Sequence, residues 1–226
     1  MAASEVRRLR ASPALRRLVG RNWSKADVVV LDVGGTRLAL KDYRPRPLVV
    51  RQTLGRWLVR REARAYEAAE GVPGLPRFHG RAGAFALATE WLDARVLAEI
   101  APDRPPSGWD DRLAAILLAL HARGVALGDL HQRDVLVGPA GDVHVVDLAT
   151  ALVLGPRPWP VRRWLFERFR DQDRVALARM RARHAGTDED EAVSAIGGPA
   201  VRWYRRGRRA RRWLDHLRGK TGTPTR

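Results

Sequence analysis

The chain contains no cysteine, no signal-like segment and no long apolar run, and each absence limits what it can be. Without cysteine it has neither a disulfide framework nor a thiolate for catalysis or metal binding. Arginines near the N-terminus are not followed by an apolar segment, so we do not expect a secretory signal. The apolar run at residues 113–120 is far too short to span a bilayer. We therefore expect a soluble, cytoplasmic protein, and a position at a membrane surface is compatible with this.

Size and charge define the class of protein and of partner. A chain of 226 residues with 45% hydrophobic residues suits one globular domain or two small lobes. The formal net charge of +17 favours an anionic partner. Nucleotides, nucleic acids, phospholipids and phosphorylated saccharides all fit that description, and charge alone does not choose among them.

Lysine is scarce, which makes one lysine informative. Only three of the 42 basic residues are lysines, and Lys41 falls in the second strand of a predicted hairpin, residues 28–33 and 38–43. Alternation along that strand puts Leu38 and Leu40 on one face and Lys41 on the other. A compact ammonium suits a phosphate at places where a guanidinium is too large. The alternative is an ordinary edge-strand lysine.

A helix predicted for residues 56–70 carries an acid on its apolar side. Glu62 lies on the same face as Leu58, Ala65 and Ala69. Because burying a carboxylate is costly unless it is paired, Glu62 needs a cation. Lys41, 21 residues upstream, is the natural partner, and a neighbouring arginine is the alternative.

The stretch from residue 127 to residue 147 gathers three acids. Two short apolar strands, residues 135–137 and 143–146, flank a turn rich in glycine and proline. Asp129 and Asp134 precede the first strand and Asp147 ends the second, so a hairpin brings the three carboxylates to one mouth. Two of them together with phosphate oxygens suit Mg²⁺, and the third can accept a proton from an attacking hydroxyl. The alternative is that these acids only cap loops or face solvent.

The spacing in this stretch resembles a kinase catalytic loop. Asp134 follows Asp129 by five residues, as the asparagine follows the aspartate in H-R-D-L-x-x-x-N, and Asp147 lies on the next hairpin. The run Gly-Asp-Leu-His followed by Val-Leu-Val is similar to atypical, small-molecule-type members of the protein-kinase-like superfamily, such as the aminoglycoside phosphotransferases. It is most similar to the bacterial lipopolysaccharide-core sugar kinases, the Kdo and heptose kinase family. Residues 61–66 and 71–76 also resemble the start of those kinases.

The resemblance implies an α+β, two-lobed protein-kinase-like fold. Residues 1–92 would form an N-lobe, a small antiparallel sheet with one helix, to which strands at residues 75–80 and 84–92 belong. Residues 93–226 would form a mostly helical C-lobe that contains a buried helix at residues 111–123.

The resemblance also implies that ATP and Mg²⁺ are bound, and it assigns roles to seven residues. Those that position the nucleotide, two through side chains and two through the inter-lobe hinge, are Lys41, Glu62, Glu90 and Leu92. The catalytic base is Asp129, and the residues that bind Mg²⁺ are Asp134 and Asp147.

Four departures from the kinase pattern keep other functions open. Leu127 replaces the histidine that opens the catalytic loop, Asp134 replaces its asparagine, and D-F-G reads Asp-Leu-Ala from Asp147 onward. No G-x-G-x-x-G precedes the first hairpin, where residues 20–25 are the available cover for the phosphates. The alternatives are a pseudokinase that binds nucleotide or docks partners, and a basic membrane-surface or nucleic-acid binder on an inactive kinase scaffold.

The expected acceptor is a hydroxyl of a lipopolysaccharide or another anionic, lipid-linked envelope saccharide, with a protein serine or threonine as the alternative. Residues 201–220 predict a basic amphipathic helix, which suggests contact with the inner membrane surface, and the alternative is a helix that packs on the C-lobe with a solvated basic face. No helix-turn-helix or zinc pattern supports nucleic-acid binding.

Further local patterns predict structure only. They are a short helix at residues 13–19, a capping box formed by Ser107 and Asp110, a helix at residues 164–184 broken near Asp171, and a helix start at residues 187–191.

Overall fold

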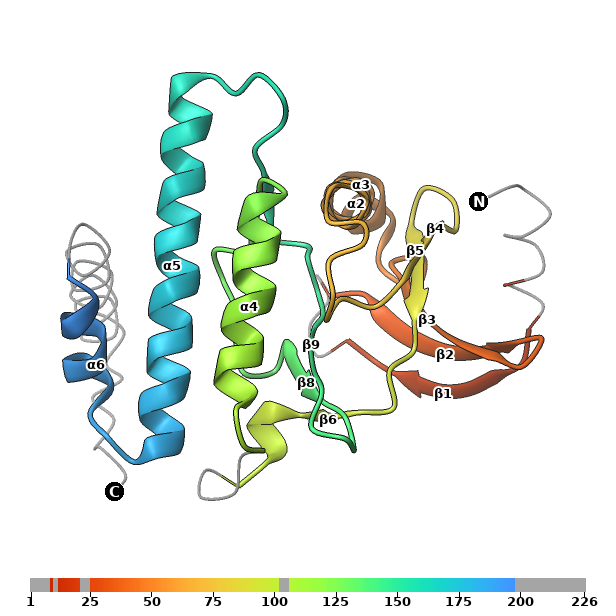
Figure 1. Cartoon of the computed structure of the whole chain (residues 1–226). Coiled ribbons are helices and arrows are strands. Elements are labelled where there is room, and N and C mark those ends of the chain that lie inside the picture. The colour runs from red at the N-terminus through yellow and green to blue at the C-terminus, as the bar shows by residue number, and fades with distance from the viewer. Residues whose placement is uncertain (1–8, 10–11, 21–24, 102–105, 198–226) are drawn as a thin grey trace, which may run out of the picture.

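The computed structural model describes residues 9, 12–20, 25–101 and 106–197 (Figure 1). The basic helix predicted for residues 201–220 lies outside the described residues, as does most of the predicted phosphate cover at residues 20–25. Within the described part, no helix is both long enough and apolar enough to cross a membrane.

The N-terminal half is built on an antiparallel sheet of five strands in the order β1-β2-β3-β5-β4. The strands are β1 (Ala14–Leu18), β2 (Asp27–Val33), β3 (Thr36–Asp42), β4 (Phe78–Arg81) and β5 (Ala86–Glu90). The predicted hairpin at residues 28–43 is confirmed, with Leu38 and Leu40 buried on one face of β3. Lys41 therefore projects from the opposite face, as the alternation of a strand requires.

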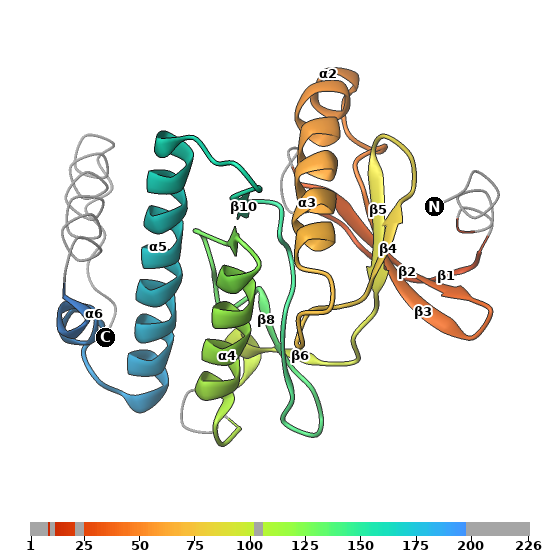
Figure 2. The same ribbon diagram turned by 45° about the horizontal axis from the view of Figure 1, so that its top comes forward.

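One long helical segment covers this sheet. It begins at α2 (Leu48–Val50), continues through a π-helical turn (Arg51–Gly55) and becomes α3 (Arg56–Ala68), which contacts β4 and β5 (Figure 2). The prediction of a helix from residue 56 is confirmed, although the chain is already helical eight residues earlier. Two adjacent valines, Val49 and Val50, give that first turn a low helix propensity, so the sequence pattern does not reveal it.

The C-terminal half is mostly helical. Its helices are α4 (Trp109–Ala122), α5 (Pro160–Ala185) and α6 (Glu189–Ile196), and α4 and α5 lie side by side (Figures 1 and 2). A 3-10 turn (Leu97–Glu99) follows its first strand. Its short strands are β6 (Arg95–Val96), β7 (Val125–Ala126), β8 (Val135–Val137), β9 (Val143–Val145) and β10 (Leu152–Val153). They form a sheet in the order β6-β8-β9 and a separate β10-β7 pair, so the hairpin predicted around residues 135–146 is confirmed.

A shared apolar core joins the two halves. The buried side of α4, which includes Leu113, Leu117 and Leu120, packs in one cluster with Val135 and Val145 of the hairpin. The same cluster includes residues from the end of α3. The hairpin of β8 and β9 therefore lies on a well-packed base that also contacts the helix of the N-terminal half.

Three local predictions are wrong for identifiable reasons. Residues 14–18 form a strand rather than a helix, because pairing with β2 outweighs the weak local preference. The helix α4 is preceded by Gly108 in a left-handed conformation and has no side-chain cap, so the capping box is absent. The helix α5 is continuous at Asp171, whose carboxylate pairs with Arg168 one turn away. The predicted start of α6 is confirmed, with Asp188 accepting hydrogen bonds from two backbone amides.

Candidate active site

Lys41 is the centre of a charged cluster between the sheet, α3 and the hairpin. Its Nζ lies 2.8 Å from Glu62 Oε2 and 2.7 Å from Asp147 Oδ1. Glu62 comes from the buried side of α3, where only 2% of it is exposed. The ion pair expected from the sequence between Lys41 and Glu62 is therefore present, and Asp147 is a second partner that the helix pattern alone does not predict.

The pKa directions in this cluster follow from burial and charge. Burial raises the pKa of Glu62 above its usual value, although Lys41 and the amide of Leu148 act against that rise. Burial would lower the pKa of Lys41, but its two carboxylate partners outweigh this effect and raise it. The opposite balance applies to Asp147, because the attraction of Lys41 exceeds the effect of burial and its pKa is lowered. Lys41 is thus a permanent cation and Asp147 a permanent anion near neutral pH.

Asp147 is held in an unusual backbone conformation. Among the described residues it is the non-glycine residue with a positive φ, 64°. Its carboxylate also accepts a hydrogen bond from the amide of Ala149 at 3.3 Å, which fixes the turn after β9. Strained residues of this kind are concentrated at functional sites, where the surrounding structure must hold them in place.

Asp134 and Asp147 are brought together by the hairpin, as the sequence predicts. The amide of Val146 donates a 2.8 Å hydrogen bond to the carbonyl of Asp134, so the backbone joins the two segments that carry these acids. Burial raises the pKa of Asp134 to about 6, and the neighbouring charges of Asp147 and Asp129 act in the same direction. Its carboxylate accepts from the amide of His131 at 3.0 Å.

This donor set fits a magnesium ion. Within the described residues, no group of three or more acidic, histidine or cysteine side chains is close enough to hold a metal by itself. Asp134 and Asp147 form a pair instead, and the charge of Asp147 raises the pKa of Asp134. A cation shared between two such carboxylates stabilises both. Mg²⁺ usually takes one or two carboxylates and completes its octahedron with phosphate oxygens and water.

Asp129 lies at the open end of the loop. Most of its side chain is exposed, and its Oδ1 is 3.2 Å from His131 Nε2. An exposed carboxylate beside the predicted metal pair can accept a proton from a hydroxyl group that approaches from solvent. His131 is a neighbour of this acid that the sequence pattern does not single out.

The predicted catalytic loop is anchored by an acid that the sequence patterns do not single out. Asp173 of α5 is fully buried and accepts hydrogen bonds from the amides of Leu127 at 2.9 Å and Gly128 at 2.7 Å. Its Oδ2 also lies 2.8 Å from His121 Nε2 of α4. These contacts hold the chain just before Asp129, and Leu127 is bound through its backbone while its side chain packs in the core.

The predicted hinge is only partly compatible with a role at the adenine. The amide of Glu90 donates to the carbonyl of Arg77 at 2.8 Å, and the amide of Trp91 donates to the carbonyl of Arg37 at 3.0 Å. Glu90 also accepts from the amide of Arg77 through its side chain. Both amides are therefore used within the sheet, whereas Leu92 lies beyond the end of β5.

A basic hollow of about 620 Å³ opens beside the predicted catalytic loop. It extends from Lys25 near the start of β2, past residues 130–134, to Arg179 and Arg183 on the last turns of α5. Both arginines pair with Glu189 at the start of α6, at 2.9 and 2.8 Å. Asp134 lines the same hollow, so it is continuous with the predicted metal site.

Comparison with known proteins supports the fold. No protein-family model matches the chain, and no curated protein matches it. Two structures of the Rio2 kinase from Chaetomium thermophilum are similar at 17% identity: its ADP/Mg²⁺-phosphoaspartate complex, with a TM-score of 0.62, and a second crystal structure, with a TM-score of 0.61.

The alignments cover 84% and 88% of this chain but only 63% and 67% of the Rio2 chains, so this protein spans about two thirds of their length. Nothing in these matches indicates the Kdo and heptose kinases in particular, and that finer resemblance stays a prediction. What the likeness shows is a two-lobed protein-kinase-like fold, with an antiparallel sheet and a helix in the first part and a helical second part.

Proposed function

We propose that this protein is an ATP-dependent phosphotransferase that moves a phosphoryl group to a hydroxyl. The observation that carries the proposal is the position of Lys41, which joins Glu62 of α3 to Asp147 at the end of the hairpin. Lys41 and Glu62 would position the nucleotide phosphates, and Asp134 and Asp147 would hold Mg²⁺. When bound, Mg²⁺ neutralises charge on the phosphate oxygens.

The protein's own contribution is positioning and proton acceptance. The acceptor hydroxyl attacks the γ-phosphorus, and its proton passes to the carboxylate of Asp129. The bond between the γ-phosphorus and the oxygen that bridges to the β-phosphate breaks, so ADP leaves. Asp173 keeps Asp129 in place by binding the two preceding amides.

The acceptor that we propose is a hydroxyl of an anionic, lipid-linked envelope saccharide. The support is the basic hollow beside Asp134, which Lys25, Arg133, Arg179 and Arg183 line. Phosphate or carboxylate groups on such a saccharide match guanidinium donors. A protein serine or threonine is the alternative acceptor, and the four cations among the residues that line the hollow favour an anionic acceptor over it.

The test is phosphate transfer from Mg·ATP to deacylated lipopolysaccharide by wild type and by the Asp129→Asn variant. We expect transfer to be lost in the variant while Mg²⁺-dependent ATP binding, measured by titration calorimetry, is retained. Asp142→Asn, in the exposed turn of the same hairpin, is the matched control and should keep both. Transfer that survives in Asp129→Asn would refute the assignment of the base.

A pseudokinase is the second candidate, and Asp134 is the residue that favours it. A carboxylate where kinases carry a neutral asparagine adds negative charge next to the phosphates. That function predicts Mg²⁺-dependent ATP binding by the wild type without transfer to saccharide or protein acceptors.

A further inference from the structure

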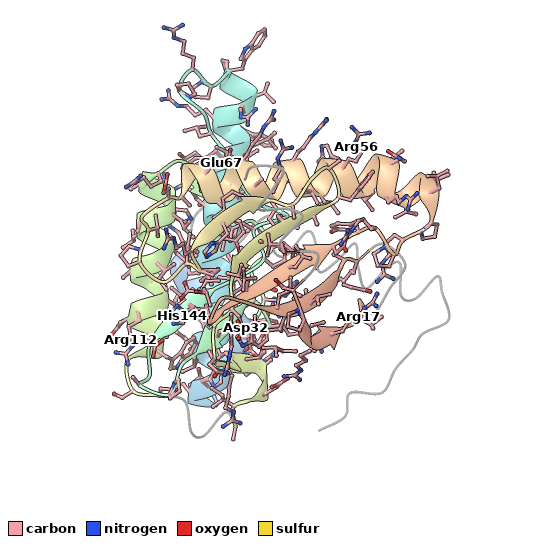
Figure 3. The ribbon with its side chains drawn as sticks, turned by 90° about the vertical axis from the view of Figure 1, so that its right-hand side faces the viewer. Arg17, Asp32, Arg56, Glu67, Arg112 and His144 are labelled. Carbon is pink, nitrogen blue, oxygen red and sulfur yellow. The ribbon has the colours of Figure 1, made fainter. Side chains whose placement is uncertain are left out.

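The start of α5 exposes a group of large apolar side chains. Trp159 is 80% exposed, Val161 68% and Trp164 51%, and Leu165 follows on the same helical turn. This end of α5 projects beyond α4 and α3 (Figures 1 and 3). We call these four residues the tryptophan patch. Exposed apolar patches of this kind on a soluble protein usually mark an interaction site.

The local structure does not need the side chain of Trp159. Trp159 is the N-cap of α5 and makes no side-chain capping bond, although serine, threonine, aspartate and asparagine are favoured there. Its contribution to the helix is its carbonyl, which accepts from the amide of Arg163 at 3.0 Å. A tryptophan that provides only a backbone group and leaves its ring in water has no structural reason for its identity.

The charges at the first turn of α5 have one sign, and the first acid of the helix is Glu167, which pairs with Arg170. Arg157, Arg162 and Arg163 are exposed beside the tryptophan patch, and the first turn of α5 contains no acid. By contrast, α4 and α6 both begin with acidic residues, as the positive end of a helix dipole favours. Arginines at the positive end of α5 repel the dipole, and an anionic partner would reverse that repulsion.

We propose that the tryptophan patch docks onto an anionic lipid bilayer. Tryptophan rings settle at the headgroup level of a membrane, aliphatic side chains enter the acyl boundary, and arginines bind the lipid phosphates. The aliphatic members, Val161 and Leu165, favour a bilayer over a nucleic acid, because they cannot stack on bases as aromatic rings do.

Other occupants fit the charge less well. In a symmetric dimer the same basic patch would face its own copy and repel it. Residues 198–226 carry ten basic residues and one acid, so this segment of the chain would also be repelled by the exposed arginines. An anionic lipid surface would attract the exposed arginines, so neither repulsion arises.

The patch also connects to the active site. Arg162 of α5 donates to the carbonyl of Val153 at 3.0 Å, and Arg61 of α3 donates to the carbonyls of Thr150 and Ala151. Arg61 stacks on Trp57, and it immediately precedes Glu62. Docking at the start of α5 would therefore act, through Arg162, on the segment that follows Asp147.

The experiment is sedimentation of the full chain with vesicles of equal parts phosphatidylcholine and phosphatidylglycerol, and with vesicles of phosphatidylcholine alone. We expect the wild type to bind the anionic vesicles, with binding that weakens in high salt. Trp159→Ser/Val161→Ser should reduce the partition coefficient at least about tenfold, and Arg157→Glu/Arg163→Glu should do the same. Leu118→Ser, at a residue 66% exposed on α4, is the control and should bind as wild type does.

Unchanged urea midpoints of the variants would show that they are folded. The proposal is overturned if the wild type does not bind anionic vesicles, or if both patch variants bind as well as wild type, which would place any membrane contact elsewhere. It also fails if light scattering shows a dimer that the patch variants dissociate, or if the wild type binds duplex DNA or RNA but not vesicles.

Discussion

Replacing Lys41 by methionine would test the central ion pair. Methionine preserves the length of the side chain but leaves Glu62, 2% exposed, without its cation at 2.8 Å. Removing one partner of a buried pair costs about 3–5 kcal/mol of unfolding free energy. We expect a loss in that range, together with the loss of Mg²⁺-dependent ATP binding.

The loss of unfolding free energy in Lys41→Met should depend on pH, and the pKa of Glu62 determines the direction of that dependence. Burial already raises the pKa of this carboxyl and Lys41 opposes the rise, so the variant has a still higher pKa. A carboxyl whose pKa is raised in the folded state keeps its proton there after the unfolded chain has lost it, so the fold loses stability as pH rises from the unfolded pKa to the folded pKa. Lys41→Met should therefore lose more unfolding free energy at about pH 8 than at about pH 5. The difference is about 1.4 kcal/mol for each pH unit by which the raised pKa of Glu62 extends into this range.

The assay is urea unfolding followed by tryptophan fluorescence, for Lys41→Met, Glu62→Gln and the double variant. Glu62→Gln keeps the 2.7 Å contact of Lys41 with Asp147, so it should lose only about 1–2 kcal/mol. The double variant no longer contains the buried charge of Glu62, and Asp147, which also loses Lys41, is half-exposed, so the loss should be smaller than the sum by about 2 kcal/mol. Additive losses that do not change with pH would refute the buried pair.

Three further predictions concern the catalytic loop. Asp173→Ala should cost about 3 kcal/mol in urea unfolding because it leaves the amides of Leu127 and Gly128 without an acceptor, whereas Asp171→Ala, which loses partly exposed pairs on the same helix, should cost less than about 1 kcal/mol. Gly128→Ala should be more destabilising than Gly155→Ala in the same assay, since both have a positive φ but only at residue 128 would the new methyl lie 2.2 Å from a ring carbon of Phe169. Because Asp134 has a pKa of about 6 and metal competes with its proton, calorimetry should show Mg·ATP affinity falling by up to about tenfold per pH unit below pH 6, and Asp134→Asn should remove that dependence.

Short-range patterns explain what was predictable. The hairpin that carries Lys41 and the hairpin that ends at Asp147 are local structures with clear turn residues, so their pairing follows from neighbouring sequence. Glu62 was found because an acid on an apolar helical stripe is costly without a partner. The contact between Lys41 and Asp147 joins residues that are 106 positions apart, and only the folded core fixes it.

Asp173, which anchors the loop, also lies on an apolar helix face, although the sequence patterns do not single it out. Asp173 lies on a stripe with Phe166 and Met180, at spacings of seven residues, and all three are buried. An acid between two apolar residues of one helix face needs partners, as Glu62 does. Its partners are backbone amides, which no side-chain pattern records, and this is why sequence alone could not connect Asp173 to the catalytic loop.

The structure distinguishes two departures from the kinase pattern, Leu127 and Asp134, by what each residue contacts. At Leu127 the fold uses the backbone amide, which binds Asp173, and the side chain packs in the apolar core. A leucine can provide both, so losing the histidine removes no group that this loop needs for its anchoring. Asp134 differs, because its carboxylate lies beside Asp147 and its charge would act directly on bound phosphates. The choice between a working phosphotransferase and a pseudokinase therefore rests on Asp134 rather than on the pair of substitutions.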